Sequence, residues 1–471
     1  MPKLVLHAPR TFERAFARIR AELDVPRGFP PEVEAGAEAA TADGTARLDA
    51  RSVPLVAVDP PGATDLDQAF MAERLADGYR VLYAIADVGA FLPPGGAVDL
   101  EARRRGLTLY SPDTRTPLHP EILSEDRASL LAGTEKPALL WTIDLDGEAR
   151  PVDWRLERAT VRIDEAISYA EAQRRIDEAS DERMMLLAEI GTLRQEREAE
   201  RGGVSLNLPA QEVVERGESY VLAFDRSLPV EGWNAQISLL TGIVAGRTMV
   251  EARVGILRTL PPPYQDDLDR LRRTAAFLQL DWPRHTSYAD FVRDLTPNDA
   301  RCNAFLVQAA RSFRGAGYVG FDGETPKHPE HGAIASVYSH VTAPLRRLVD
   351  RFGNEVLLAL YADRRPPAWA LEALDELPSL MGRSRQRESA LERAILDMAE
   401  ALVLQNSVGE VFDGLVVALD EQRDRAVVQI AEPAIVSHVP TAGRSLAESV
   451  KLRVEAVDVD ERRVDFEVVD G

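Results

Sequence analysis

The sequence predicts an α+β fold, with a large mixed domain followed by a small β-barrel. Apolar segments typical of buried strands follow residue 51, helical patterns begin near residue 160, and short strand-like segments separated by turns return after residue 406. Strands first and helices later favour one mixed sheet with helices in residues 51–405. The last segments match a five-stranded OB-type barrel in residues 406–471.

The first 50 residues predict a small helical unit. Phe12, Phe16 and Ile19 recur on one face of a helix in "RTFERAFARIRAELD", and a proline opens a second helix in "FPPEVEAGAEAAT". Two successive helices resemble a helix-turn-helix, but the second is acidic. A DNA-recognition helix needs basic residues, so a DNA-binding regulator has little support.

The middle and last parts of the chain supply the remaining elements. Buried strands are predicted in "SVPLVAVD", "YRVLYAIADV" and "ALLWTIDLDG". Residues 160–202 are predicted to be helical, and longer helices follow in "WNAQISLLTGIVAGRTMVEAR", "APLRRLVDRFGNEVLLALYA" and "LEALDELPSLMGRSRQRESALERAILDMAEALVLQ". The barrel strands are "EVFDGLVVALD", "RAVVQIAE", "IVSHVP", "VKLRVEAVDV" and "RVDFEVV".

Composition narrows the classes of function. The net charge of -21 argues against a protein that coats nucleic acid, but it allows a nuclease with a locally basic channel. The one cysteine, Cys302, excludes a disulfide framework and a Cys-rich zinc site, and we expect it buried on a helix. Without a membrane-spanning apolar run or a signal peptide, the sequence predicts a cytoplasmic protein that does not bind membranes.

Three motifs point to chemistry that their surroundings do not support. "GAGYVG" matches a dinucleotide-binding pattern, but it follows a predicted helix and precedes a predicted loop. "HPEH" brings His328 and His331 close together without an obvious third zinc ligand. "DLDQAFMAERL" begins like a calcium loop, but Ala69 and Phe70 stand where a ligand and a glycine are required.

The acidic stretch "VAVDPPGATDLDQAF" is the strongest candidate for a site. It carries Asp59, Asp65 and Asp67 around a Pro-Pro-Gly bend that lets the chain fold back. Mg²⁺ and Mn²⁺ prefer carboxylate oxygens, and crowded acids repel one another unless a cation or bound protons offset their charge. On spacing alone, a metal site and a solvated acidic turn remain equally open.

A second candidate is "YSHVTAPLRRLVD", in which Arg346 and Arg347 lie near the start of a helix. Arginine offers a planar fork of donors suited to phosphate, and a helix N-terminus favours an anion. Taken alone, this stretch fits ordinary salt-bridge partners better than a phosphate site.

Together, the two stretches resemble the RNB-domain exoribonucleases, the ribonuclease II and ribonuclease R family. The family signature is an Asp, five residues, then Asp-x-Asp-Asp-Ala, and this chain follows it except for Gln68. Further similar segments, in the family's order, are "YAIADVGAFL", "GLTLYSPDTRTPLHPEILSEDRASLLAG", "GILRTLPPP" and "YSHVTAPLRRLVD". The C-terminal barrel resembles the family's S1-type RNA-binding domain.

The resemblance implies a role for each matching residue. Arg346 matches the arginine that meets the scissile phosphate, and Tyr110 matches the tyrosine that packs against the 3′-terminal nucleotide. The expected catalytic residues are Asp59, Asp65, Asp67 and Arg346. The expected metal ligands are Asp59, Asp65, Asp67 and Gln68. The expected RNA contacts are Tyr110, Tyr338, Arg346, Arg347 and Glu392.

Three departures from the family pattern concern the site. The fourth acid is Gln68 here, a neutral side chain that we expect to bind metal more weakly. The family's base-stacking aromatic falls on Leu206, and its pair of glutamates falls on Ala235 and Gln236. We therefore expect a looser or differently built grip on the last nucleotides.

The implied activity is hydrolysis of RNA from its 3′ end to nucleoside 5′-monophosphates, with two Mg²⁺ or Mn²⁺ ions and little sequence preference. The family's cold-shock barrels have no counterpart in the first 50 residues, so we expect a wider entrance that accepts structured RNA with a 3′ overhang as well as single-stranded 3′ ends. We expect a monomer. The alternative is a catalytically weak RNA-binding protein of the same fold, which Gln68 and Leu206 favour and the retained acids oppose.

Overall fold

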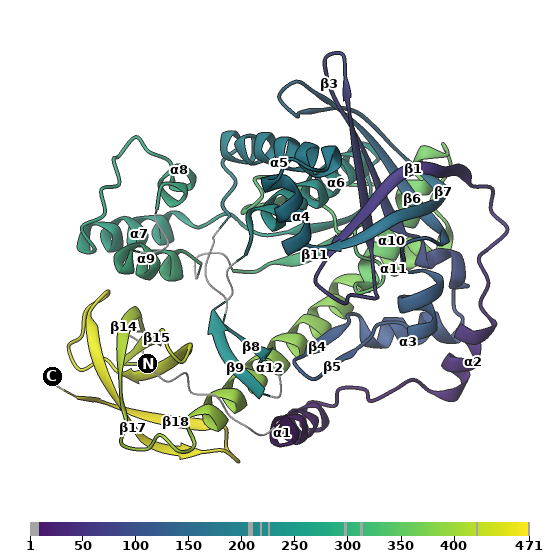
Figure 1. The fold of residues 1–471 in the computed structure, drawn as a ribbon. Helices are drawn as coiled ribbons and strands as arrows, with labels where there is room; N and C mark the ends of the chain where they lie inside the picture. Colours follow the sequence, from purple (N-terminus) through teal and green to yellow (C-terminus); the bar gives the residue numbers. More distant parts are fainter. Residues whose placement is uncertain are drawn as a thin grey trace.

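The computed structural model describes residues 9–205, 211–216, 219–224, 227–295, 299–310, 314–420 and 423–469. It is a large α+β body with a β-barrel at its side, as the sequence predicts (Figure 1). Leu206 lies outside the described residues. None of the helices described is long and apolar enough to cross a lipid bilayer.

A closed five-stranded barrel forms the centre of the large domain. Its strands, in spatial order, are β1 (Leu48–Asp59), β2 (Gln68–Leu75), β3 (Gly78–Ala86), β6 (Glu135–Asp146) and β7 (Pro151–Ser168). Neighbours are antiparallel except β1 and β7, which are parallel and close the barrel. The sheet is therefore mixed, as expected.

The two faces of these strands differ in the size of their side chains. Tyr83 and Trp141 are buried on the face that packs on helices α5 (Glu182–Glu200) and α6 (Pro229–Ala252). The opposite face carries alanines from β1, β2, β3 and β6. Side chains alternate between faces along a strand, so the aromatic residues meet the helices and the alanines lie on the other face, together with Leu55, Leu140 and Ile163.

The helical segment begins later than the sequence predicts. β7 continues to Ser168, whose hydroxyl caps helix α4 (Tyr169–Asp177). Ala159, Val161 and Ile163 are buried, Thr160, Arg162 and Asp164 alternate with them and are more exposed, and the segment pairs with β1. This alternation is a strand pattern, so the prediction of a helix from residue 160 is wrong.

Further helices and two-stranded sheets complete the large domain and its connection to the C-terminal barrel. The helices are η1 (Val88–Phe91), α3 (Ala97–Arg105), η2 (Ile122–Arg127), α7 (Gln265–Phe277), α8 (Tyr288–Arg293), α9 (Ala300–Ala310), α10 (Leu348–Tyr361), α11 (Ala368–Ala373) and α12 (Leu377–Leu404). The strand pairs are β4 (Leu109–Ser111) with β5 (Thr114–Thr116), β8 (Gln211–Arg216) with β9 (Ser219–Phe224), β10 (Val254–Thr259) with β11 (Gly317–Asp322), and β12 (Glu330–His331) with β13 (Ser336–Val337).

Two smaller predictions are confirmed by these elements. The "GAGYVG" segment leads into β11, and β12 rather than a helix follows it, so it is not a dinucleotide-binding turn. Cys302 is buried on α9.

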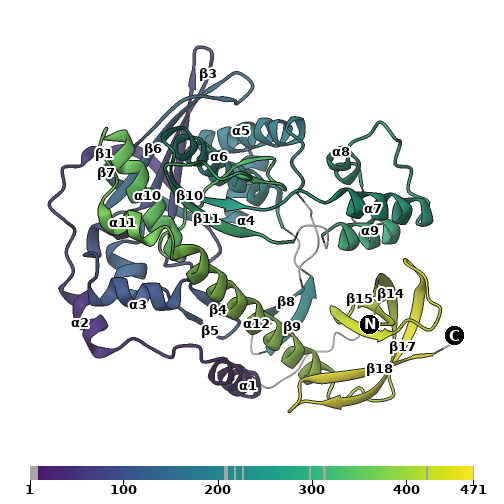
Figure 2. The same ribbon diagram turned by 180° about the vertical axis from the view of Figure 1, so that it is seen from behind.

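The C-terminal barrel is joined to the large domain by α12. Its antiparallel strands, in spatial order, are β16 (Ile435–Pro440), β15 (Arg425–Ile430), β14 (Val411–Asp420), β17 (Ser449–Asp458) and β18 (Arg463–Val469). The edge strands β16 and β18 approach each other, so the sheet nearly closes into the expected OB-like barrel. Figure 2 shows α12 running from the large domain to this barrel, where its residues Leu391 and Leu402 join the barrel core.

The two N-terminal helices pack on different parts of the chain. α1 (Pro9–Glu22) contributes Phe16 and Ile19 to the core shared by α12 and the barrel, whereas α2 (Pro31–Ala39) packs against α3. A segment without regular secondary structure separates them, and Figure 1 shows them well apart. They therefore do not form a helix-turn-helix, whose two helices follow each other after a short turn.

Candidate active site

The acidic stretch occupies the loop between β1 and β2. β1 ends at Asp59, the chain turns through residues 60–62, and β2 begins at Gln68. Gly62 has a φ of +79°, a left-handed conformation that suits glycine. Because β1 and β2 are antiparallel neighbours, the loop brings its acids together at one end of the barrel.

A cleft of about 750 Å³ opens at this end of the barrel. It gathers most of the expected site residues: Asp59, Asp65, Asp67, Gln68, Tyr110 and Arg346. Further polar residues that line it include Arg115, Tyr169 and Asn234. The two stretches identified in the sequence thus meet in one cleft.

Asp67 is the buried acid of the site. Its Oδ1 accepts a hydrogen bond from the backbone N–H of Leu345 at 2.8 Å, and its Oδ2 lies 3.4 Å from Nε of Arg346. Burial raises the pKa of Asp67 to about 8, and the charge of Arg346 and the N–H of Leu345 only partly offset that effect. Asp67 therefore joins the start of β2 to the loop that carries Arg346.

Asp59 has a free carboxylate. Within the described residues, its side chain makes no hydrogen bond or ion pair. Burial raises the pKa of Asp59 to about 6; Arg346 lowers it and the nearby Asp65 raises it. A desolvated carboxylate facing a cleft is suited to bind a cation.

Asp65 is held by the hairpin formed by β4 and β5. Arg115 donates from Nη1 to Oδ1 of Asp65 at 2.7 Å, and the Tyr110 hydroxyl donates to Oδ2 at 3.2 Å. Tyr110 and Arg115 are direct partners across the hairpin, and such partners project from the same face. The hairpin register therefore brings one cation and one aromatic ring to the same acid.

Gln68 uses both ends of its amide within the protein. Its Nε2 donates to the backbone carbonyl of Thr342 at 2.7 Å, and its Oε1 accepts from the hydroxyl of Tyr83. A carbonyl can only accept, so the contact with Thr342 fixes which end of the amide is nitrogen. Gln68 thus links β2 and β3 to the arginine-bearing loop, with its oxygen engaged by Tyr83.

The two adjacent arginines have separate environments. The side chain of Arg346 is 48% exposed in the cleft beside Asp67. Arg347 forms a two-pronged ion pair with Asp350, at 2.9 Å and 2.7 Å, and Asp350 is fully buried. Burial alone would lower the pKa of Arg347, but Asp350 raises it above its ordinary value. Arg346 is available to a ligand, whereas Arg347 holds the start of α10.

Besides Arg347, two expected RNA contacts do not line the cleft. Tyr338 is 6% exposed, and its ring lies directly on Gly242 of α6, where a side chain would collide with it. Glu392 is exposed on α12, near Arg385 and Glu388. The expectation that Tyr338 faces RNA conflicts with its burial, because a core ring cannot stack on a base.

The donor set suits a hard divalent cation, although no cage is preformed. Across the ranges the structure describes, no three His, Cys, Asp or Glu side chains are grouped so that they could hold a metal ion. Burial nevertheless raises the pKa values of Asp59 and Asp67, because it disfavours their ionised forms, and Arg346 offsets that effect only in part. Mg²⁺ is usually bound by one or two carboxylates, with water and substrate phosphate completing its coordination. The residues fit an ion held by Asp59 together with a substrate.

Three residues of the cleft were not predicted from the sequence. Tyr169 follows Ser168, which pairs with Asp59 across β1 and β7, and that register cannot be read from sequence. Asn234 comes from α6. The sequence predicts this helix, but it does not predict which side of the helix faces the cleft. Arg115 could have been found, because "PD" in "YSPDTR" is a turn signal that places Tyr110 opposite Arg115.

Family models match most of the chain. The RNB domain matches residues 47–363, and the RNase II-type exonuclease C-terminal S1 domain matches residues 410–469. The exosome complex exonuclease RRP44 homolog A of Arabidopsis thaliana is 30% identical over 330 residues, covering 66% of this chain and 35% of that protein. Ribonuclease R of Escherichia coli is 23% identical, covering 98% of this chain and 60% of that protein.

Solved structures share the fold. Mycoplasma genitalium RNase R in complex with ribose-methylated single-stranded RNA has a TM-score of 0.87 at 18% identity, covering 98% of this chain and 78% of that one. Yeast Ssd1, described as a pseudonuclease, has a TM-score of 0.72 at 16% identity, covering 94% and 57%. The chain spans 35% to 60% of the length of the curated relatives named above. Its match to the RNB domain over residues 47–363 shows that the chain belongs to the RNB-domain exoribonuclease family.

Proposed function

We propose that this chain is a metal-dependent 3′→5′ exoribonuclease that releases nucleoside 5′-monophosphates. The observation that carries the proposal is the convergence of Asp59, Asp65, Asp67 and Arg346 in one cleft. Family membership supports the reaction class, and two relatives carry the names ribonuclease R and exosome complex exonuclease.

The acids are the residues that would hold Mg²⁺ or Mn²⁺, two ions in the scheme that the resemblance implies. A bound ion would offset phosphate charge and lower the pKa of an attacking water. Asp59 presents a free carboxylate to the cleft, and Asp67 fixes the loop that bears Arg346. Gln68 acts as a brace through Tyr83 and Thr342 rather than as a strong ligand.

Arg346 and Tyr110 handle the substrate. Half-exposed Arg346 donates N–H groups to the phosphate oxygens, where negative charge builds up in the transition state. Tyr110 is 48% exposed and offers its ring to the terminal base. Stacking contributes about 1–3 kcal/mol per base and reads no sequence, so little base preference is expected.

The substrate class is RNA with a free 3′ end, bound by a monomer. Single strands fit a cleft that gathers two tyrosines, two arginines and four aspartates. Structured RNA with a 3′ overhang is also proposed as a substrate; Mycoplasma genitalium RNase R, of similar fold, has been solved with double-stranded RNA. A duplex with a short 3′ overhang tests this: digestion that stops many nucleotides before the duplex contradicts it.

The second candidate function is RNA binding without efficient catalysis. It is favoured by Gln68 in place of an acid and by the fold shared with Ssd1, a pseudonuclease. The nuclease is favoured by Asp59, whose free carboxylate has no structural partner among the described residues. A site kept only for binding has no need of that acid.

Incubation of 5′-labelled oligo(A) with Mg²⁺ or Mn²⁺ distinguishes the nuclease from the RNA-binding protein. The nuclease is supported if the RNA is shortened from its 3′ end, and if this shortening is abolished by EDTA and by Asp67→Asn. Asp144→Asn is the matched control, because Asp144 pairs with Arg80 away from the cleft. RNA that is bound but stays intact supports the binding protein and contradicts the nuclease.

A further inference from the structure

We propose that Arg115 takes the place of the second divalent ion, so that this chain binds one Mg²⁺ where a two-ion site would bind two. The inference rests on the proposed function, since it concerns the metal content of the same cleft. It assigns Arg115 a positioning role, because its guanidinium acts through Asp65.

The guanidinium of Arg115 lies between two carboxylates. It donates to Asp65 at 2.7 Å and forms an ion pair with Glu125. It also donates to Oγ1 of Thr64 at 2.7 Å, and Thr64 donates to Glu125 at 2.9 Å. The side chains of Asp65, Arg115 and Glu125 are 15%, 27% and 20% exposed. A cation fixed between two partly shielded carboxylates has the electrostatic role of a bound metal ion.

The balance of charge leaves room for one divalent ion. Asp65 is paired with Arg115, and Asp67 lies 3.4 Å from Nε of Arg346. Asp59 is the acid of the stretch that has no cationic partner among the described residues. With Glu125 included, four carboxylates face two guanidinium groups and leave two negative charges, which one Mg²⁺ neutralises.

Gln68 does not rebuild a second metal site. It is neutral, and its amide oxygen already accepts a hydrogen bond from Tyr83 while its nitrogen donates to Thr342. A second ion at Asp65 would therefore have to displace Arg115, since no free carboxylate lies beside it within the described cleft.

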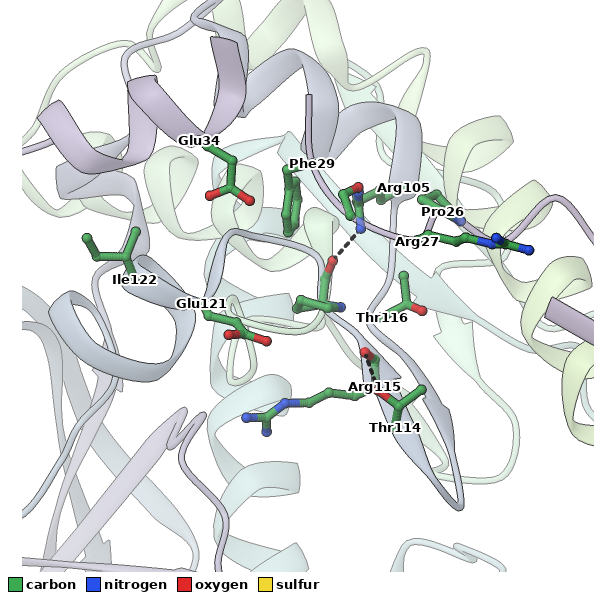
Figure 3. Close-up of a pocket in the computed structure, with 12 residues that line it drawn as sticks. Pro26, Arg27, Phe29, Glu34, Arg105, Thr114, Arg115, Thr116, Glu121 and Ile122 are labelled. Atoms are coloured by element: carbon green, nitrogen blue, oxygen red, sulfur yellow. Dashed lines mark hydrogen bonds between the residues drawn. The ribbon is translucent and has the colours of Figure 1, made fainter. Parts of the chain in front are cut away.

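Arg115 is fixed by the fold rather than by a chance approach. The register of the β4–β5 hairpin places it opposite Tyr110, and it lines both the acidic cleft and a neighbouring cavity of about 440 Å³. Figure 3 shows its side chain in that cavity extending away from Arg27 and Arg105. Arg105 is paired with Glu101 and therefore does not compete for Asp65.

Calorimetric titration of the full chain with MgCl₂, without RNA, tests the proposal. The expected stoichiometry is one ion for the wild type and two for Arg115→Gln at the same MgCl₂ concentrations. Adding Asp65→Asn to Arg115→Gln should return the count to one. Arg115→Lys keeps the positive charge and should bind one ion, as the wild type does.

A matched control is Arg80→Gln, which removes an arginine from a two-pronged pair with Asp144 outside the cleft and should leave one ion. Thermal unfolding without Mg²⁺ checks that each variant is folded, and Arg115→Ala replaces Arg115→Gln if the latter is not. Two ions in the wild type, or no gain in the Arg115 variant, overturns the proposal. Neither result overturns the nuclease, which the RNA gel decides separately.

Discussion

Arg20 of α1 forms a two-pronged ion pair with Asp113, at the turn of the hairpin that carries Tyr110 and Arg115. The two hydrogen bonds measure 2.7 Å and 2.8 Å, and the side chains are only 15% and 9% exposed. The N-terminal helix, which also packs on α12, thus braces the hairpin that covers the acids. A segment with no catalytic residue of its own therefore bears on the shape of the site.

We predict that Arg20→Ala loosens this hairpin. Losing the shielded pair should raise amide hydrogen exchange in residues 109–116 and weaken RNA binding about fivefold, which corresponds to roughly 1 kcal/mol. Arg18→Ala is the control. Arg18 lies on the same helix as Arg20, but its ion pair is with Asp460, whose side chain is 87% exposed. Unchanged exchange in the hairpin would show that Arg20 is not its brace.

Gln68→Met separates a bracing role from a metal ligand. The substitution keeps the length of the side chain but leaves the Tyr83 hydroxyl and the Thr342 carbonyl without their partner. The free energy of unfolding should fall by about 1–3 kcal/mol, and Mg²⁺ affinity should stay within about twofold. Asp59→Asn should instead weaken Mg²⁺ binding. Equal losses of affinity in both variants would make Gln68 a ligand.

Arg346 and Arg347 should respond to alanine in opposite ways. Arg346→Ala removes a half-exposed donor, so kcat should fall about 10²- to 10³-fold with little change in melting temperature. Arg347→Ala leaves Asp350 buried without its cation, which should cost about 3–5 kcal/mol of stability. Thermal unfolding and single-turnover kinetics measure the two effects. A folded, active Arg347→Ala protein would contradict this division.

Glu400 should make stability depend on pH. Burial against the C-terminal barrel raises its pKa to about 7, and its hydrogen bonds from Gln211 and the N–H of Val436 offset part of the rise. The folded state then binds the proton more tightly than the unfolded state, whose pKa is near 4.5. The stability gained from that proton is complete below pH 4.5 and is lost as pH rises through about 7.

Glu400→Gln should remove the loss of stability that accompanies a rise in pH through about 7. Urea unfolding at pH 8 should show the variant more stable than the wild type, on the order of 1 kcal/mol, relative to the same comparison at pH 5. Glu410→Gln, at an exposed position, is the control. The same difference at both pH values would mean that Glu400 does not titrate in this range.

The sequence predicted the gathering of the acids because a bend between two strands is a local signal. Asp59 and Asp67 flank that bend, and the chain can return only along the neighbouring strand. The different roles of Arg346 and Arg347 could not be predicted. They depend on where α10 begins and on the burial of Asp350, which only the packed chain determines.

Long-range packing explains the other differences. The apolar face of α1 was visible in the sequence, but its partner, α12, lies near the other end of the chain. The end of β7 was misassigned because charged residues on the exposed face of a strand resemble a polar helix when the partner strand is unknown. The pairing of Arg115 with Asp65 depends on the register of the β4–β5 hairpin and on the position of that hairpin beside the acidic loop.

The most direct test of the account is single-turnover release of the 3′-terminal nucleotide from an RNA oligomer with Mg²⁺, compared between the wild type and Asp67→Asn at matched RNA binding. The account predicts nucleoside 5′-monophosphate released one at a time from the 3′ end, and a rate at least about 10²-fold lower in Asp67→Asn despite a similar Kd for RNA. Internal cleavage products, bound but intact RNA with the wild type, or equal rates for the two proteins would contradict it.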